Sequence, residues 1–256
     1  MSMADRDGLI WYDGEMVEWR NATTHVLTHS LHYGMGVFEG VRAYETPAGT
    51  AIFRLKEHTD RLFESAHIMG MKIPYTHDEI NAAPIAAVRE NNLKSAYIRP
   101  LAFYGSEGMG IRADNLRVHV IVAAWHWGAY MGEEALKTGI RIRTSSFTRH
   151  HVNITMTRAK SSGAYVNSML ALQEAVSAGA DEALLLDPEG YATTRTYDNL
   201  GRLVKLSQPD PDNGGNNPAL VVEYAYDAAG QLLVATGPDG SRTEYAYDGS
   251  GRRTRE

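Results

Sequence analysis

The residue types of this chain change near residue 190. All ten histidines lie at or before His151, all ten methionines at or before Met169, and all four tryptophans at or before Trp127. From Ala192 to the end, histidine, methionine, tryptophan and phenylalanine are absent, while five tyrosines appear. A single domain would draw on the same residue types throughout, so this break predicts two kinds of structure in one chain.

Before the break, strand and helix patterns are mixed. The run "LIWYDGEMVEW" reads as a hairpin, because its Asp13-Gly14 pair tolerates the positive φ of a tight turn. Further strands are predicted at 37–44, 51–55, 95–105, 117–125 and 139–147, and helices at 56–69, from 76 onward and at 163–179. This layout is typical of an α/β or α+β enzyme.

Two of these helices carry specific expectations. Thr76 and Glu79 fit a capping box at a helix start, and Pro84 is expected to kink or shorten the helix that follows. In the helix at 163–179, an apolar face is predicted from the spacing of Tyr165, Met169, Leu172 and Val176.

After the break a short motif recurs. Tyr-Asp pairs stand at 197–198, 226–227 and 247–248, and a glycine follows each aspartate by three residues. The spacing predicts a repeated unit of strand, Asp/Gly turn and strand.

The composition argues against several classes of protein. A net charge of −6 provides no basic face for nucleic acid, and the absence of cysteine excludes disulfides and thiolate metal sites. No apolar run approaches the roughly 20 residues that span a bilayer, and no secretory signal is seen. We therefore expect a cytoplasmic protein with neither a nucleic-acid nor a membrane partner.

Lys160 is the first candidate for chemistry. It lies in "TMTRAKSSGAYVNSM", just before a turn of small residues and a helix. A lysine held near a desolvated pocket can lose its proton and attack a carbonyl to give a Schiff base. Taken alone, a single lysine is more often a solvated surface charge, and the residues by themselves leave that alternative open.

Four segments together resemble the branched-chain amino acid aminotransferases, of the fold-type IV pyridoxal-phosphate family. They stand in the family's order and cover residues 9–191: "HSLHYGMGVFEGVRAY", "FRLKEHTDRL", "SAYIRPLAFYG" through "WHWGAYMG", and "RAKSSGAYVNSMLALQEA". The resemblance implies the α/β (α+β) class IV fold, similar to D-amino acid aminotransferase, and a homodimer or higher homo-oligomer. A small domain is expected at 1–130 and the truncated first part of the large domain at 131–191.

The same resemblance implies roles for particular residues. Lys160 would carry pyridoxal 5'-phosphate as a Schiff base and move the substrate proton, Arg61 would bind the phosphate, and Tyr165 would hydrogen-bond the phenolic oxygen. Arg99 would bind the carboxylate of glutamate or 2-oxoglutarate. The pocket for Leu, Ile and Val side chains would be aromatic, formed by Tyr33, Phe38, Tyr97, Trp127 and Tyr130. No histidine set with the pattern of a metal site is seen.

The resemblance stops near residue 191. Where the family has a glutamate that contacts the pyridine nitrogen, this chain has Thr194, and the family's later phosphate and carboxylate loops are missing. Residues from about 194 to 256 instead resemble the YD repeats of Rhs and teneurin proteins, which predicts a β-rich tail over 192–256. Turnover is therefore expected to be poor. Two alternatives remain: a non-catalytic fusion or misassembled fragment, and a D-amino acid transaminase or aminodeoxychorismate lyase of the same fold.

Overall fold

A computed structural model of the protein divides into two compact units. The first comprises Met1–Arg141 with His150–Met169, and the second Ile142–Arg149 with Leu170–Glu256. The structure describes residues 2–128, 132–151, 154–188, 190, 192, 194–197, 203–207, 220–227, 229–249 and 252–255. Within these residues, no helix is both long and apolar enough to cross a membrane.

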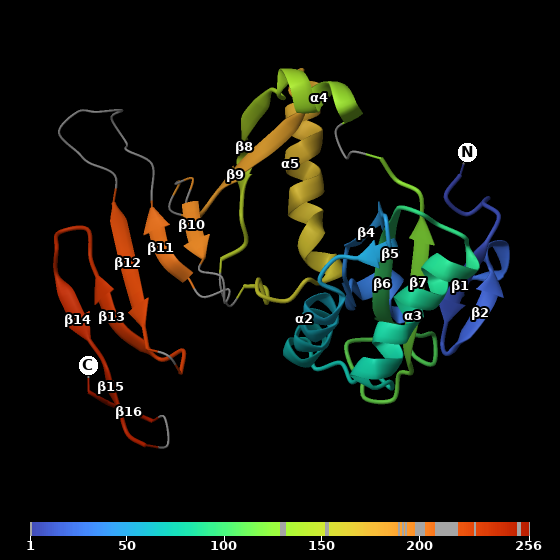
Figure 1. Ribbon diagram of the computed structural model, residues 1–256, viewed down its shortest axis with the longest axis horizontal. Helices are drawn as coiled ribbons and strands as arrows, with labels where there is room; N and C mark the ends of the chain where they lie inside the picture. The colour runs from blue at the N-terminus through green and yellow to red at the C-terminus, as the bar shows by residue number, and fades with distance from the viewer. Residues whose placement is uncertain are drawn as a thin grey trace. The chain divides into compact units, whose positions relative to one another are not determined.

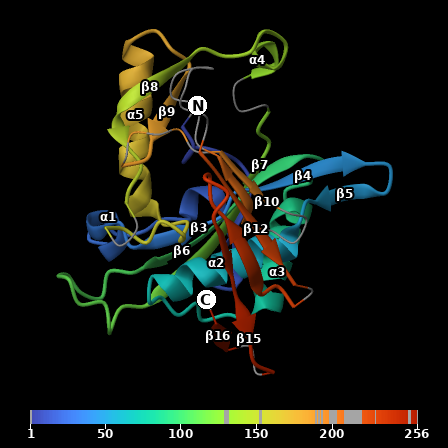
Figure 2. The ribbon, with the colours of Figure 1, turned by 90° about the vertical axis from the view of Figure 1, so that its left-hand side faces the viewer.

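The first unit is built on a seven-stranded antiparallel sheet (Figure 1). Its strand order is β2-β1-β7-β6-β4-β5, and the short β3 also pairs with β6. Figure 2 shows the β4–β5 hairpin projecting from the edge of this sheet. The strands are β1 (Leu9–Tyr12), β2 (Glu15–Glu18), β3 (Gly36–Phe38), β4 (Val41–Thr46), β5 (Gly49–Ile52), β6 (Ala96–Tyr104) and β7 (Val118–Trp125).

The turns of this sheet follow from the residues at them. Asp13 and Gly14 join β1 to β2 with φ values of 49° and 102°, so the hairpin prediction is confirmed. The strand expected over 37–44 is in fact two strands. Glu39 and Gly40 interrupt it, and β3 and β4 on either side of them both pair with β6.

Two long helices, α2 (Leu55–Ile68) and α3 (His77–Glu90), cover one face of the sheet (Figure 1). Leu62 of α2, Ile80 of α3 and Ile98 of β6 are fully buried in the core between them. The capping box at Thr76 is present, as predicted. Pro84 does not shorten α3, because the helix continues to Glu90 and the proline ring is itself buried in the core. The first unit also has η1 (Trp19–Asn21), α1 (His29–Tyr33), α4 (Gly132–Thr138) and η2 (Ser162–Tyr165).

In the second unit, β8 (Ile142–Thr148) and β9 (Glu182–Leu186) form a parallel pair. The helix between them in sequence, α5 (Val166–Ser177), contains the division between the two units. Its predicted apolar face is wrong: Met169 and Val176 are 70% and 56% exposed. The buried positions are instead Ala171 and Ala175, whose small side chains allow close packing.

The tail consists of β10 (Thr194–Tyr197), β11 (Leu203–Ser207), β12 (Val221–Tyr226), β13 (Leu232–Thr236) and β14 (Arg242–Glu244) in one antiparallel sheet, followed by the pair β15 (Ala246–Tyr247) and β16 (Arg253–Arg255). Each tyrosine of the repeat is the last residue of its strand, directly after a register shift. The Asp227 carboxylate then accepts from the backbone N–H of Gln231 at 2.8 Å, and Asp248 accepts from Arg252 at 2.9 Å. The recurring motif is therefore a strand, a bulge and an aspartate-closed turn.

Candidate active site

The backbone of Lys160 is held by β3 and α2. The N–H of Phe38 donates to the Lys160 carbonyl at 3.1 Å, and the Lys160 N–H donates to the hydroxyl of Ser65 at 3.0 Å. The next residue, Ser161, forms an isolated β-bridge with Val37. Segments far apart in the sequence thus fix the base of the lysine side chain.

The side-chain nitrogen of Lys160 lies among aromatic rings. Its Nζ donates to the Tyr165 hydroxyl at 2.6 Å, and it lies 4.9 Å from the centre of the Phe38 ring. The two rings themselves are 5.1 Å apart, measured between their centroids. η2 makes this possible, because its tight turn carries Tyr165 back towards the lysine.

A cavity of about 730 Å³ surrounds this lysine, within the range of ligand sites in proteins. It brings together six of the nine predicted site residues. The lining consists of Phe38, Arg42, Tyr97, Arg99, Trp127, Lys160, Ser162 and Tyr165. Arg42 and Ser162 are not among the predicted residues. Strand alternation along β4 could have identified Arg42, and the closeness of Ser162 to Lys160 in the sequence could have identified Ser162.

Arg99 supplies the cation of the cavity wall. Its Nη2 donates to the Tyr97 hydroxyl at 2.7 Å, and its guanidinium carbon lies 4.6 Å from the centre of the Phe38 ring. Its Nε is buried and has no hydrogen-bond partner among the described residues. A buried unpaired donor is costly, so the site is suited to an anionic ligand that accepts from it.

The apolar wall is a cluster of rings. Tyr97 contacts Trp125 and Trp127 with centroid distances of 5.0 and 4.8 Å. Gly40 makes room for it, because a Cβ built at Gly40 would lie 2.5 Å from the Tyr97 hydroxyl. This glycine is a site residue that the sequence did not reveal.

Arg61 lies beside the cavity without lining it. Its Nε and Nη2 donate to the two carboxylate oxygens of Glu39 at 2.6 and 2.7 Å, and His58 Nδ1 lies 2.9 Å from the same carboxylate. Burial by itself raises the pKa of Glu39, but the hydrogen bonds from Arg61 and His58 outweigh it, so this pKa is lowered.

Two predicted pocket residues are not placed in this cavity. The centroid of the Tyr33 ring lies 4.4 Å from that of His29, with the two planes tilted by 32°, and the Tyr33 hydroxyl accepts from the Gly110 N–H at 3.1 Å. Tyr130 lies outside the described residues. Their part in substrate binding stays a prediction.

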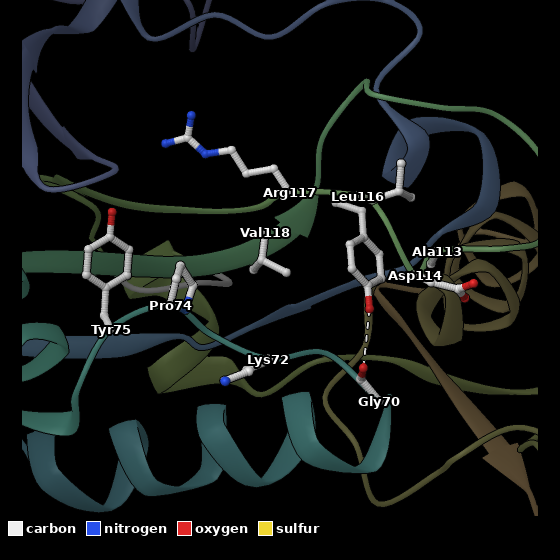
Figure 3. A pocket seen from close by; sticks show the side chains of 10 residues that line it. Gly70, Lys72, Pro74, Tyr75, Ala113, Asp114, Leu116, Arg117 and Val118 are labelled. Carbon is white, nitrogen blue, oxygen red and sulfur yellow. Dashed lines mark hydrogen bonds between the residues drawn. The ribbon is translucent and has the colours of Figure 1, made fainter.

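A second cavity of about 400 Å³ lies elsewhere in the first unit (Figure 3). It contains Lys72, Tyr75 and Arg117 but none of the predicted site residues. The dashed line in Figure 3 is the hydrogen bond from the Tyr104 hydroxyl to the Gly70 carbonyl at 3.4 Å. Among the described residues there is no group of His, Asp and Glu able to hold a metal ion.

Comparison with protein families identifies this arrangement. The model of amino-transferase class IV matches residues 36–208, which include Lys160 and its cavity. The chain belongs to the class IV aminotransferase family. The family resemblance expected from the sequence is thereby confirmed, as is the mixed α/β class IV fold. A match to the RHS repeat at residues 226–256 confirms the resemblance of the tail.

A curated relative of this class IV chain is a branched-chain-amino-acid aminotransferase. The branched-chain-amino-acid aminotransferase of Pseudomonas aeruginosa is 78% identical over 200 residues, which cover 78% of this chain and 65% of the relative. The chain thus spans 65% of this relative's length, slightly less than two thirds.

Solved structures of related enzymes carry cofactor compounds. The T.th. branched-chain amino acid aminotransferase with pyridoxamine 5'-phosphate is 52% identical, with a TM-score of 0.71 over 74% of this chain and 62% of that one. The same enzyme complexed with N-(5'-phosphopyridoxyl)-L-glutamate is 49% identical, with a TM-score of 0.67 over 73% and 60%.

Proposed function

We propose that this chain is a pyridoxal-phosphate-dependent transaminase that moves the amino group of Leu, Ile or Val to 2-oxoglutarate. The observation that carries the proposal is the amine of Lys160, 2.6 Å from the Tyr165 hydroxyl inside an aromatic cavity with a buried arginine. A nucleophilic amine, an apolar wall and a carboxylate-binding cation are what this reaction requires.

The residues present fit the cofactor. Lys160 offers an amine for covalent attachment, Tyr165 a hydroxyl for the phenolic oxygen, and Arg61 a guanidinium for the phosphate. When bound, pyridoxal phosphate supplies an aldehyde and an electron-withdrawing ring. Lys160 then holds and moves a proton at Nζ, and the hydrogen bond to Tyr165 orients that atom.

The pocket supports two kinds of substrate. Phe38, Tyr97 and Trp127 form an apolar surface that excludes water from a branched side chain. Arg99 presents its unpaired Nε to the side-chain carboxylate of glutamate or 2-oxoglutarate. This mixture favours the branched-chain reaction over a D-amino acid transaminase or a lyase of the same fold.

Slow turnover is part of the proposal. Thr194, the first residue of β10, stands where the resemblance implies a glutamate at the pyridine nitrogen. A neutral hydroxyl cannot supply the negative charge that favours a protonated ring. The division into 1–130, 131–191 and 192–256 belongs to the same proposal; the RHS match at 226–256 supports a separate tail, while the class IV match extends past residue 191 to residue 208.

The chain is further proposed to act in the cytoplasm as a homodimer or larger homo-oligomer. Tyr33 carries the argument for a homo-oligomer. Its hydroxyl binds the Gly110 backbone, next to Ile111, whose side chain is 95% exposed. Leu31 beside Tyr33 is 65% exposed, and such apolar exposure is typical of an interface.

The test is covalent trapping followed by an assay. The purified chain is incubated with pyridoxal phosphate and reduced with borohydride, and the adduct is located by peptide mass spectrometry. We expect it on Lys160, and we expect Lys160→Ala to lose it. Slow glutamate formation from leucine and 2-oxoglutarate should accompany it. An adduct at Lys160 without any turnover would favour the non-catalytic alternative, which the RHS match at 226–256 supports.

A further inference from the structure

Glu39 is a carboxylate with no exposed side-chain surface, directly after Phe38 of the cavity lining. Its Oε1 accepts from Arg61 Nε at 2.6 Å, and its Oε2 accepts from Arg61 Nη2 at 2.7 Å. His58 Nδ1 lies 2.9 Å from Oε2. A buried carboxylate is costly unless it is paired, and a bidentate arginine is the pairing that fixes its partner's orientation best.

Glu39 is itself fixed by the sheet. Its backbone N–H donates to the carbonyl of Pro100 at 2.9 Å, and it directly follows Phe38, whose N–H donates to the carbonyl of Lys160. Two adjacent residues, Phe38 at the end of β3 and Glu39 after it, therefore contact the lysine and the arginine of the proposed cofactor site.

Arg61 is connected to the lysine from its own side as well. It lies one turn before Ser65 on α2, and Ser65 accepts the backbone N–H of Lys160. The guanidinium is therefore on the helix face that meets the Lys160 segment. Its position is set by α2, and its orientation by Glu39.

The Glu39 pair occupies only one edge of the guanidinium. An arginine has five N–H donors in a planar fork, and Glu39 uses one at Nε and one at Nη2. The Arg61 side chain is 50% exposed and has no other hydrogen-bond partner among the described residues. The remaining N–H groups form a second edge that can bind a phosphate without breaking the first pair.

We propose that Glu39 is the positioning residue for Arg61, holding the guanidinium plane so that its free edge receives the phosphate of the cofactor. The inference rests on the proposed function, because it assumes that the cofactor is attached at Lys160. The effect expected from removing the Glu39 charge is the opposite of what simple electrostatics would give. Glu39 is an anion near a phosphate, so removing its charge would strengthen phosphate binding if charge alone mattered. If Glu39 instead orients the Arg61 guanidinium, removing its charge weakens phosphate binding.

The experiment compares pyridoxal 5'-phosphate with pyridoxal, which lacks the phosphate. The full chain is titrated with each compound and reduced with borohydride, and the Lys160 adduct is quantified by mass spectrometry. We expect wild type to half-saturate at a lower concentration of the phosphorylated compound. Glu39→Gln should raise that concentration about tenfold and leave the value for pyridoxal unchanged.

A matched control is available on α2. Glu57 also pairs with an arginine, Arg54, but both side chains are more than half exposed. Glu57→Gln should change neither titration. If Glu39→Gln fails to give the wild-type near-ultraviolet circular dichroism, Glu39→Asp replaces it. Aspartate keeps the charge but is too short to reach both Arg61 donors. The half-saturating concentration of pyridoxal 5'-phosphate should therefore rise as in Glu39→Gln, but by a smaller factor.

The outcomes separate the two proposals. If wild type prefers the phosphorylated compound and the Glu39 variants keep or strengthen that preference, the role of Glu39 is overturned and the proposed function stands. If wild type gives no Lys160 adduct with either compound, both proposals fail. If wild type gives adducts of equal affinity, Arg61 binds no phosphate and the role of Glu39 is overturned.

Discussion

Arg99 Nη2 donates a 2.7 Å hydrogen bond to the hydroxyl of Tyr97, two residues earlier on β6. Strand alternation places both side chains on the face opposite Ala96 and Ile98, which are buried in the core. The bond fixes the arginine against the aromatic wall while its Nε stays unpaired among the described residues. One strand thus supplies both the apolar and the ionic part of the proposed pocket.

We predict that Arg99→Lys separates the two substrates. Lysine keeps the charge but loses the planar fork, so binding of a side-chain carboxylate should weaken most. The KM for 2-oxoglutarate should rise about tenfold or more, with a much smaller change for leucine. Steady-state kinetics on both substrates measure this, and equal losses on both would show that Arg99 does not discriminate between them.

Tyr165→Phe should loosen the cofactor without unfolding the protein. The Tyr165 hydroxyl accepts one hydrogen bond, from Lys160 Nζ. The residue is 38% exposed, so its substitution loses little packing. A single hydrogen bond contributes about 1 kcal/mol, or roughly a fivefold change. The concentration of pyridoxal phosphate that half-saturates the trapped adduct should rise by about that factor. An unchanged value would remove Tyr165 from the site.

Gly40→Ala should disturb the aromatic wall. The new Cβ would clash with the Tyr97 hydroxyl, which must move away from Arg99. Overpacking of this kind costs about 1–3 kcal/mol, so the melting temperature should fall together with the activity. Gly128→Ala is the control, since no described residue beyond its chain neighbours has an atom within 4 Å of a Cβ built there. Similar melting temperatures for the two variants would contradict the prediction.

Acid stability should depend on Glu39. Its pKa is lowered in the folded state, so its pairing stabilises the protein above the unfolded-state pKa of about 4.3 and is lost as the pH falls through the folded value. Urea unfolding between pH 3 and pH 6 should show stability falling towards the acid end. In Glu39→Gln this acid-side slope should be shallower, and an identical slope would argue that other carboxylates dominate.

Asp227→Ala should weaken the tail and spare the site. The carboxylate closes a repeat turn by accepting from the Gln231 N–H at 2.8 Å. Its loss should cost about 1 kcal/mol, visible as faster amide exchange at Gln231. Asp227→Asn keeps an acceptor oxygen and serves as the control. Equal protection in both variants would show that the turn does not need this side chain.

Several features were predictable because they are local. The hairpin at Asp13-Gly14, the capping box at Thr76 and the recurring Tyr-Asp turns each depend on residues adjacent in the chain. The predictions that failed did so because tertiary packing overrode a local pattern. Of the two effects expected of Pro84, a kink or a shorter helix, the shortening does not occur, because α3 continues past the buried proline to Glu90. The exposed Met169 is predicted on a buried face that alanines form instead.

The sequence by itself determined the two kinds of structure in this chain and the residue types of the site: a lysine, two arginines and a set of aromatic rings. The tertiary structure decided which of them meet. It placed Lys160 against Phe38 and gave Arg61 a buried partner in Glu39, which reads in the sequence as an ordinary strand charge. Local periodicity sets the face on which a side chain lies. Contacts between distant segments depend on how strands and helices pack, and no spacing in the sequence records that.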